Sequence, residues 1–250
     1  LAVFLLASSV GMEYYVVHQL NGEVTGRNRP FAALTVEPED TLDLLVAGDS
    51  ESYNSVSTMR LWDDKGITTY DCGQGAQRIP ETYYMLKHAF KKQSPKIVIL
   101  ETNTLFRDIG AVKSTQEILT QAGQYYLPVF RYHNLWKTVV DEPEMHTNYK
   151  GFVIRDEVDP YEGKLDYMKK KKKCETMPEY VKVYLEKIEE LCEKNNAQLL
   201  LVSMPSPKNW NHKRHAEIQK YADGKGITYL DLNKKVEELG LNWTEDTQDK

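Results

Sequence analysis

Short apolar runs alternate with amphipathic stretches along most of the 250-residue chain. Five of these runs are bounded by glycine, proline or polar residues, a pattern that is typical of buried strands. They cover residues 41–47, 67–71, 96–101, 198–204 and 227–232. Because helical patterns separate them, we predict a five-stranded parallel sheet with helices on both faces, which is a flavodoxin-like three-layer α/β/α fold.

One long segment interrupts this alternation. Residues 105–177 are aromatic and punctuated by proline, with a helical stretch near residues 113–124, and we interpret them as a large insertion. Within it, residues 169–173 are consecutive lysines, which could contact an anionic polymer or lipid head groups. The simpler interpretation of the lysine run is a solvated loop. The alternation resumes at Pro178, after which apolar residues at three-and-four spacing predict a helix.

The first residues of the chain are apolar. The chain begins with Leu1 rather than methionine, and residues 1–12 contain no charged side chain. A membrane span needs roughly 20 apolar residues, so this segment is too short to cross a bilayer by itself. We interpret residues 1–20 as the tail of an N-terminal signal peptide or membrane anchor, with a buried first helix or strand as the alternative. A polar linker at 21–40 would then lead to one extracytoplasmic domain at 41–250.

Composition and charge exclude several classes of function. The formal net charge of −5 and the pI near 5.8 argue against a dedicated nucleic-acid-binding protein. Three scattered cysteines are too few for a disulfide scaffold or a zinc site. His212 and His215 have a spacing that can bind metal, but no third ligand is visible, so a solvated helix face is the simpler interpretation. We therefore expect neither a metal nor a cofactor.

Candidate chemistry gathers where the predicted strands end. Parallel sheets bind ligands beyond the carboxyl ends of their strands, and the first strand delivers Gly48, Asp49 and Ser50 there. The second strand delivers a glycine turn at residues 73–76, and the third delivers Asn103. A serine beside backbone N–H groups and an amide is suited to attack a carbonyl carbon while those donors stabilise the oxyanion.

Together these residues resemble the SGNH/GDSL hydrolases, over roughly residues 41–250. Gly-Asp-Ser at 48–50, the glycine turn and Asn103 are similar to three of the four sequence blocks of that family. The resemblance implies the SGNH hydrolase fold, with Ser50 as nucleophile and with Gly75 and Asn103 as oxyanion donors. Ala76 is the alternative to Gly75, because the family glycine could align one position later.

The residues near these strand ends also depart from the family pattern in places, and two of them have alternative roles. Glu51 stands where the family commonly has leucine, and Glu101 stands where it usually has glycine, which points to a divergent branch. Ser50 could instead be the N-cap of the next helix, and Asn103 could fix its own loop. A flavodoxin-like nucleotide binder is disfavoured, because no glycine-rich phosphate loop follows the first strand.

The fourth block of the family, an Asp-x-x-His pair, is absent. Residues 242–250 contain Asp246 and Asp249 but no histidine. We interpret the chain as ending before the catalytic histidine, which would leave this chain inactive and would make Asp249 a candidate orienting carboxylate. A true loss of the block, giving a pseudoenzyme, is the alternative.

Three further residues are candidates for substrate contact. His133 lies among aromatic residues in the insertion and could line the substrate cleft, although packing or surface placement is the simpler interpretation. Asn209 and Trp210 follow the fourth strand, where they could form a wall for a sugar ring.

These features predict an extracytoplasmic serine esterase or O-acyltransferase that acts through an acyl-Ser50 intermediate. The resemblance extends to envelope-anchored proteins that modify cell-wall polymers. It implies an acylated carbohydrate or cell-envelope polymer as substrate and a membrane-bound O-acyltransferase as partner. The alternative is a non-catalytic envelope protein that binds glycan or such an acyltransferase.

Overall fold

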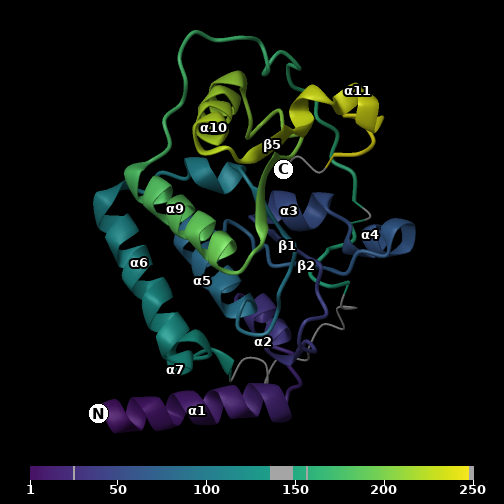
Figure 1. The fold of residues 1–250 in the computed structure, drawn as a ribbon. Helices are drawn as coiled ribbons and strands as arrows, with labels where there is room; N and C mark the ends of the chain where they lie inside the picture. The colour runs from purple at the N-terminus through teal and green to yellow at the C-terminus, as the bar shows by residue number, and fades with distance from the viewer. Residues whose placement is uncertain (25, 136–148, 156, 248–250) are drawn as a thin grey trace.

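A five-stranded, all-parallel sheet forms the centre of the computed structural model, which describes residues 1–24, 26–135, 149–155 and 157–247 (Figure 1). The strand order is β2-β1-β3-β4-β5. The strands are β1 (Leu44–Ala47), β2 (Thr69–Asp71), β3 (Ile97–Glu101), β4 (Gln198–Ser203) and β5 (Thr228–Asp231). Each lies within the apolar run that predicted it, and the predicted fold class is confirmed.

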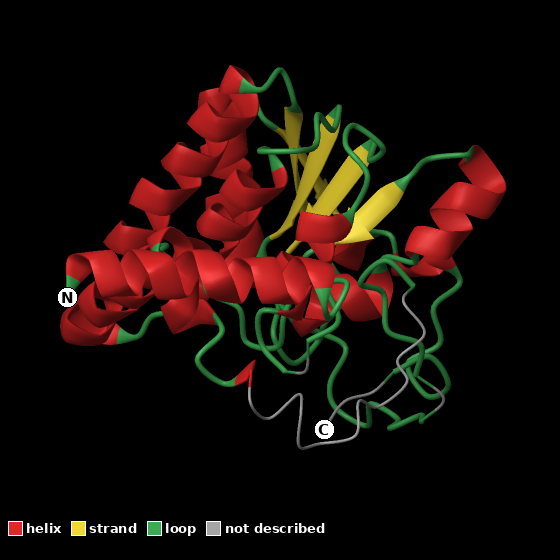
Figure 2. Ribbon diagram, turned by 90° about the horizontal axis from the view of Figure 1, so that it is seen from below, coloured by secondary structure: helices red, strands yellow, loops and turns green. Residues whose placement is uncertain are grey.

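Helices connect and flank the strands, and most of them gather on one side of the sheet (Figure 2). They are α1 (Ala2–His18), α2 (Arg29–Val36), α3 (Ser50–Ser55), α4 (Thr58–Lys65), α5 (Ile79–Ala89), α6 (Gly110–Tyr126), α7 (Pro128–Arg131), α9 (Glu179–Lys194), α10 (His212–Lys225) and α11 (Val236–Leu239). Short 3-10 turns, η1 (Asn103–Phe106) and η2 (Leu232–Lys234), follow β3 and β5. The predicted helix after Pro178 is therefore confirmed as α9.

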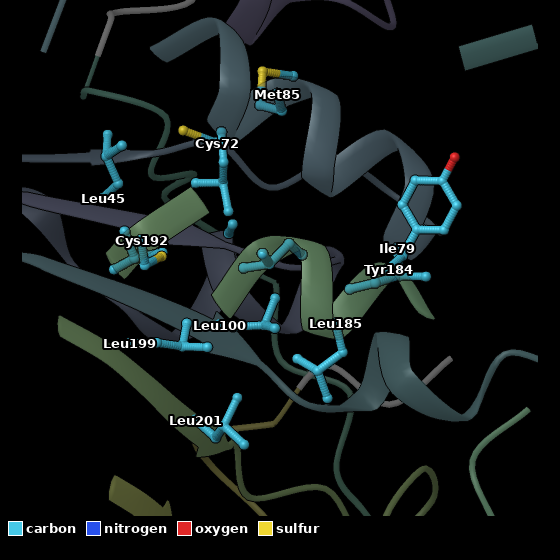
Figure 3. Close-up of a cluster of buried hydrophobic side chains, with 14 of the residues drawn as sticks. Leu45, Cys72, Ile79, Met85, Leu100, Tyr184, Leu185, Cys192, Leu199 and Leu201 are labelled. Carbon is cyan, nitrogen blue, oxygen red and sulfur yellow. The ribbon is translucent and has the colours of Figure 1, made fainter. Parts of the chain in front are cut away.

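The main hydrophobic core lies between the sheet and helices α5 and α9 (Figure 3). Leu45, Leu100 and Leu201 come from three adjacent strands, and all three are fully buried. Met85 of α5 and Leu185 of α9 pack into the same cluster. This packing fixes the strand ends relative to one another, because the core is continuous across β1, β3 and β4.

Residues 21–40 are not a simple polar linker. They contain α2, which has Pro30 in its first turn and which buries Phe31 and Leu34 in the main core. The polar residues that flank α2 obscured its apolar face in the sequence, and a helix of eight residues is too short to show a clear periodicity.

The first residues form the helix α1, which contacts α2 and α7 (Figure 1). Val16 is fully buried, whereas Leu1, Val3 and Phe4 are exposed. None of the helices in the described part of the chain has both the length and the apolar character needed to cross a membrane.

The segment interpreted as an insertion is partly integrated into the fold. Its helix α6 packs against α5. After the residues that the structure does not describe, the chain returns beside β2 and α3, where Lys150 O accepts a bond from Asp71 N at 2.8 Å and Val153 N donates to Tyr53 O at 3.0 Å. The lysine run at 169–173 is exposed, as expected for a solvated loop.

Replacing Leu185 by alanine should test the packing of α9 on the sheet. Leu185 is fully buried, so its truncation should lower the free energy of unfolding by about 2–5 kcal/mol through lost burial and the cavity left behind. Val183→Ala is the matched control, because Val183 lies on the same helix with 43% of its surface exposed and should change stability far less. Urea denaturation measures both variants, and equal losses would contradict the packing described.

Candidate functional site

Asp49, directly after β1, is the residue around which the site is organised. Its side chain is the N-cap of α3, because Oδ1 accepts a hydrogen bond from the Glu51 N–H at 2.9 Å. Oδ2 accepts a bond from Asn103 Nδ2 at 3.0 Å and forms an ion pair with Arg107. Because Asn103 and Arg107 both follow β3, these contacts tie the ends of β1 and β3 together.

Ser50 occupies the first position of α3. The capping role considered for Ser50 belongs to Asp49 instead, so the serine hydroxyl is not committed to the helix cap. Ser50 is half-buried and lines a cavity of about 1420 Å³. Glu51, Asn54 and Asn209 line the same cavity, which gives its end near Ser50 a polar surface.

The glycine turn after β2 lies beside the start of α3. A Cβ at Gly73 would overlap Ser52 Oγ and lie 2.8 Å from Asp71 Oδ1, and the Gly73 N–H already donates to Asp71 Oδ1 at 2.7 Å. Gly75 is exposed, and a Cβ there would meet only the Tyr53 hydroxyl, at 3.6 Å. Gly73 is therefore required by packing, whereas Gly75 is the more open member of the turn.

Asn103 is buried in η1, and its amide is bonded on both sides. Nδ2 donates to Asp49, and Oδ1 accepts a bond from Arg214 Nη1 at 3.1 Å. An amide nitrogen carries two hydrogens, so the bond to Asp49 leaves one donor for another acceptor. This arrangement is compatible with an oxyanion donor held in a fixed orientation.

The loop after β4 reaches the start of α3. Asn209 Nδ2 donates to Glu51 Oε1 at 2.8 Å, and Arg214 Nη1 donates to the Asn209 carbonyl at 2.6 Å. Arg214 thus contacts both Asn209 and Asn103, and it connects the loop after β4 with the segment after β3. Asn209 lies at the cavity, as expected for a substrate contact.

Trp210 and His133 do not line this cavity. Trp210 is 2% exposed, packs edge-on to Phe106 and directs Nε1 toward Asp231 Oδ2 at 3.4 Å, so its ring is part of the core rather than a wall for a sugar. His133 is exposed and lines a separate hollow along α6, with Nδ1 2.7 Å from the Phe130 carbonyl. Asp249 lies outside the described residues.

Buried acids surround the start of α3. Burial, and then the charge of Asp49, raise the pKa of Glu51 to about 7. Burial raises the pKa of Asp71 to about 7 as well, although the Gly73 N–H and the Ser52 hydroxyl donate to it. Burial and the charges of Asp49 and Glu51 raise the pKa of Glu101 well above its ordinary value. The site therefore holds protons that free carboxyl groups would lose near neutral pH.

A buried His–Asp pair was missed by the sequence analysis. His215 Nδ1 lies 2.8 Å from Asp231 Oδ2, and both side chains are almost fully buried, so the expectation that His215 is on a solvated helix face is wrong. Burial favours a higher pKa for Asp231, but bonds from His215 and Asn233 outweigh it and lower the pKa. His215 Nε2 faces Lys234 Nζ at 2.6 Å, so this ring is not directed at Ser50. The only sequence signal was the position of Asp231 at the end of a strand.

Two further features of the site concern its histidines and its acidic residues. Among the residues that the structure describes, no histidine lines the cavity beside Ser50. One carboxylate oxygen from each of Asp49, Glu51 and Glu101 lies within 4.8 Å of the other two, an arrangement that could hold a metal ion.

Comparison with known proteins adds little to this picture. No family model matches the chain, and no curated protein matches it either. Among solved structures, the chain is similar to a provisionally assigned acylhydrolase from Bacteroides fragilis, with 12% sequence identity and a TM-score of 0.35. That match covers 86% of this chain and 74% of the other. A similarity this slight carries no argument, so the function must be inferred from the site itself.

Asp71→Asn should flatten the pH dependence of stability. A carboxyl whose pKa is raised in the folded state contributes stability at low pH and loses that contribution as pH rises from its ordinary value of about 4 through about 7. From pH 5 to pH 8, the free energy of unfolding of the variant should therefore rise by about 2–3 kcal/mol relative to that of the wild type. Urea denaturation at both pH values measures this difference. Asp63→Asn, at an exposed position of α4, is the control and should follow the wild type. Parallel profiles for wild type and Asp71→Asn would contradict the assignment.

Proposed function

We propose that this chain is a serine esterase or O-acyltransferase of the SGNH type, with Ser50 as nucleophile. One observation carries the proposal. Ser50 lines the cavity near the carboxyl end of β1, and Asp49, which caps the helix of Ser50, also accepts a hydrogen bond from the Asn103 amide. The proposed nucleophile and the proposed oxyanion donor are thus both connected to one buried carboxylate.

The proposed reaction has two steps. Ser50 Oγ forms a bond to the carbonyl carbon of an ester, its proton passes to a general base, and the negative charge develops on the carbonyl oxygen near Asn103 Nδ2. The C–O bond to the alcohol then breaks, and the alcohol leaves with the proton from the base. Water or a hydroxyl group of a polymer attacks the acyl-Ser50 and releases the acid or a new ester.

The proposed mechanism requires a general base for Ser50. A serine hydroxyl needs a base at neutral pH, and the cavity has no histidine in its described lining. The family resemblance implies that an Asp-x-x-His block supplies the base. Asp249 is the candidate for the aspartate of that block.

Substrate and location follow from the same resemblance. We propose an acylated carbohydrate or cell-envelope polymer as substrate, a membrane-bound O-acyltransferase as a partner, and an extracytoplasmic, membrane-anchored location. The polar lining of the cavity near Ser50 and the uncharged, partly exposed residues 2–12 of α1 support this proposal. A non-catalytic glycan-binding protein is the second candidate, favoured by the lack of a histidine in the described lining of the cavity.

Ser50→Ala in the full-length protein should abolish turnover of an aryl acetate and labelling by a serine-directed fluorophosphonate. The expected loss of rate is about a thousandfold or more, because the nucleophile itself is removed. Ser55→Ala is the matched control, since Ser55 lines the same cavity at the end of α3 and should keep near wild-type activity. Activity of Ser50→Ala within tenfold of the wild type would exclude the serine mechanism, and a wild type with neither activity would favour the binding protein.

Asn103→Ala should lower kcat by about a hundredfold with little change in KM, as expected for the loss of one oxyanion donor. Asn209→Ala removes an amide that lines the cavity, and it should affect KM more than kcat because Asn209 is the proposed substrate contact. Steady-state kinetics at a temperature where both variants are folded separates the two roles. A KM effect alone for Asn103→Ala would make Asn103 a binding residue.

A further inference from the structure

Three carboxylates converge near the carboxyl ends of β1 and β3. Asp49 follows β1, Glu51 lies on α3, and Glu101 is the last residue of β3. A carboxylate oxygen of each lies within 4.8 Å of the other two. Gly48 makes this approach possible, because a Cβ there would lie 2.5 Å from Glu101 Cβ.

One atom of this acidic group has no partner in the described structure. Glu101 is fully buried, and its Oε1 accepts a bond from the Asn103 N–H. Its Oε2 is also buried and accepts no hydrogen bond from any described residue. A buried carboxylate oxygen without a donor is costly, because it has lost its water without replacement. This atom points to a ligand that the protein residues do not supply.

Two arginines near the group already have acidic partners. Arg107 pairs with Asp49, and the guanidinium of Arg214 pairs with Glu175 while it also contacts the Asn103 amide. Glu51 accepts a bond from the neutral amide of Asn209. Arg107 supplies positive charge to Asp49, and a divalent cation would supply it to Glu51 and Glu101 as well.

We propose that Asp49, Glu51 and Glu101 bind a divalent cation of the Mg²⁺ class, which enters from the cavity past Glu51. Carboxylate oxygens are the ligands that hard cations take. Three protein carboxylates are few for Ca²⁺, which takes six to eight oxygen ligands, whereas Mg²⁺ commonly keeps several waters. Glu51 lines the cavity, so the side of the cation facing it would be open to water.

Titration with Mn²⁺, a spectroscopic substitute for Mg²⁺, tests the site. The electron paramagnetic resonance signal of free Mn²⁺ reports how much ion remains unbound when the full chain is titrated at neutral pH. We expect saturable binding of about one ion per chain, displaced by excess Mg²⁺, with binding weakened at least tenfold by Glu101→Gln. Glu190→Gln is the control, since Glu190 is an exposed acid on α9, and it should bind as the wild type does.

The Mn²⁺-binding results and the tests of the serine mechanism can fail independently of one another. Circular dichroism verifies the fold of Glu101→Gln, and Glu51→Gln replaces it as the test variant if that protein does not fold. Ser50→Ala should bind Mn²⁺ like the wild type, because Ser50 is not one of the proposed ligands. Absence of saturable binding to the wild type, or equal binding by the Glu101→Gln and wild-type proteins, would overturn the proposed cation site whatever the esterase assays show.

Discussion

The buried carboxylate of Asp49 is the interaction on which the candidate site depends. A carboxylate that has left water needs donors and a counter-charge, and Asp49 receives them from the Glu51 N–H, the Asn103 amide and Arg107. These donors belong to different parts of the chain, so satisfying one charge fixes the start of α3 against the segment after β3. The position of Ser50 at the first residue of α3 is a consequence of that cap.

Gly48 and Glu101 show how closely the two strand ends approach. Since a side chain at position 48 would collide with Glu101, the residue that follows β1 must be glycine for the longer side chain at the end of β3 to fit. The larger side chain at this contact therefore lies on β3, and it is a buried acid.

The sequence predicted the features of the fold that depend on the local pattern of apolar and polar residues. Apolar runs marked the strands, and the rule that ligands bind at carboxyl ends placed Ser50, Asn103 and Asn209 at one edge of the sheet before any contact was known. The sequence did not reveal which residues far apart in the chain contact one another. The pairing of His215 with Asp231 and the burial of Trp210 against Phe106 depend on how α10 docks, which no local periodicity encodes. The helix α2 was missed because an eight-residue helix shows too little of its period among polar flanks.

The docking of α10 also decides which way the Asn103 amide faces. Arg214 can only donate hydrogen bonds, and the Asp49 side chain, which is paired with Arg107, accepts them. With Arg214 on one side and Asp49 on the other, the amide oxygen must face Arg214 and the nitrogen must face Asp49. A flipped amide would set two donors against each other and two acceptors against each other. An aspartate at position 103 would set a carboxylate against Asp49. Asparagine is therefore the side chain that satisfies both neighbours, and the same contacts fix the direction of its remaining N–H.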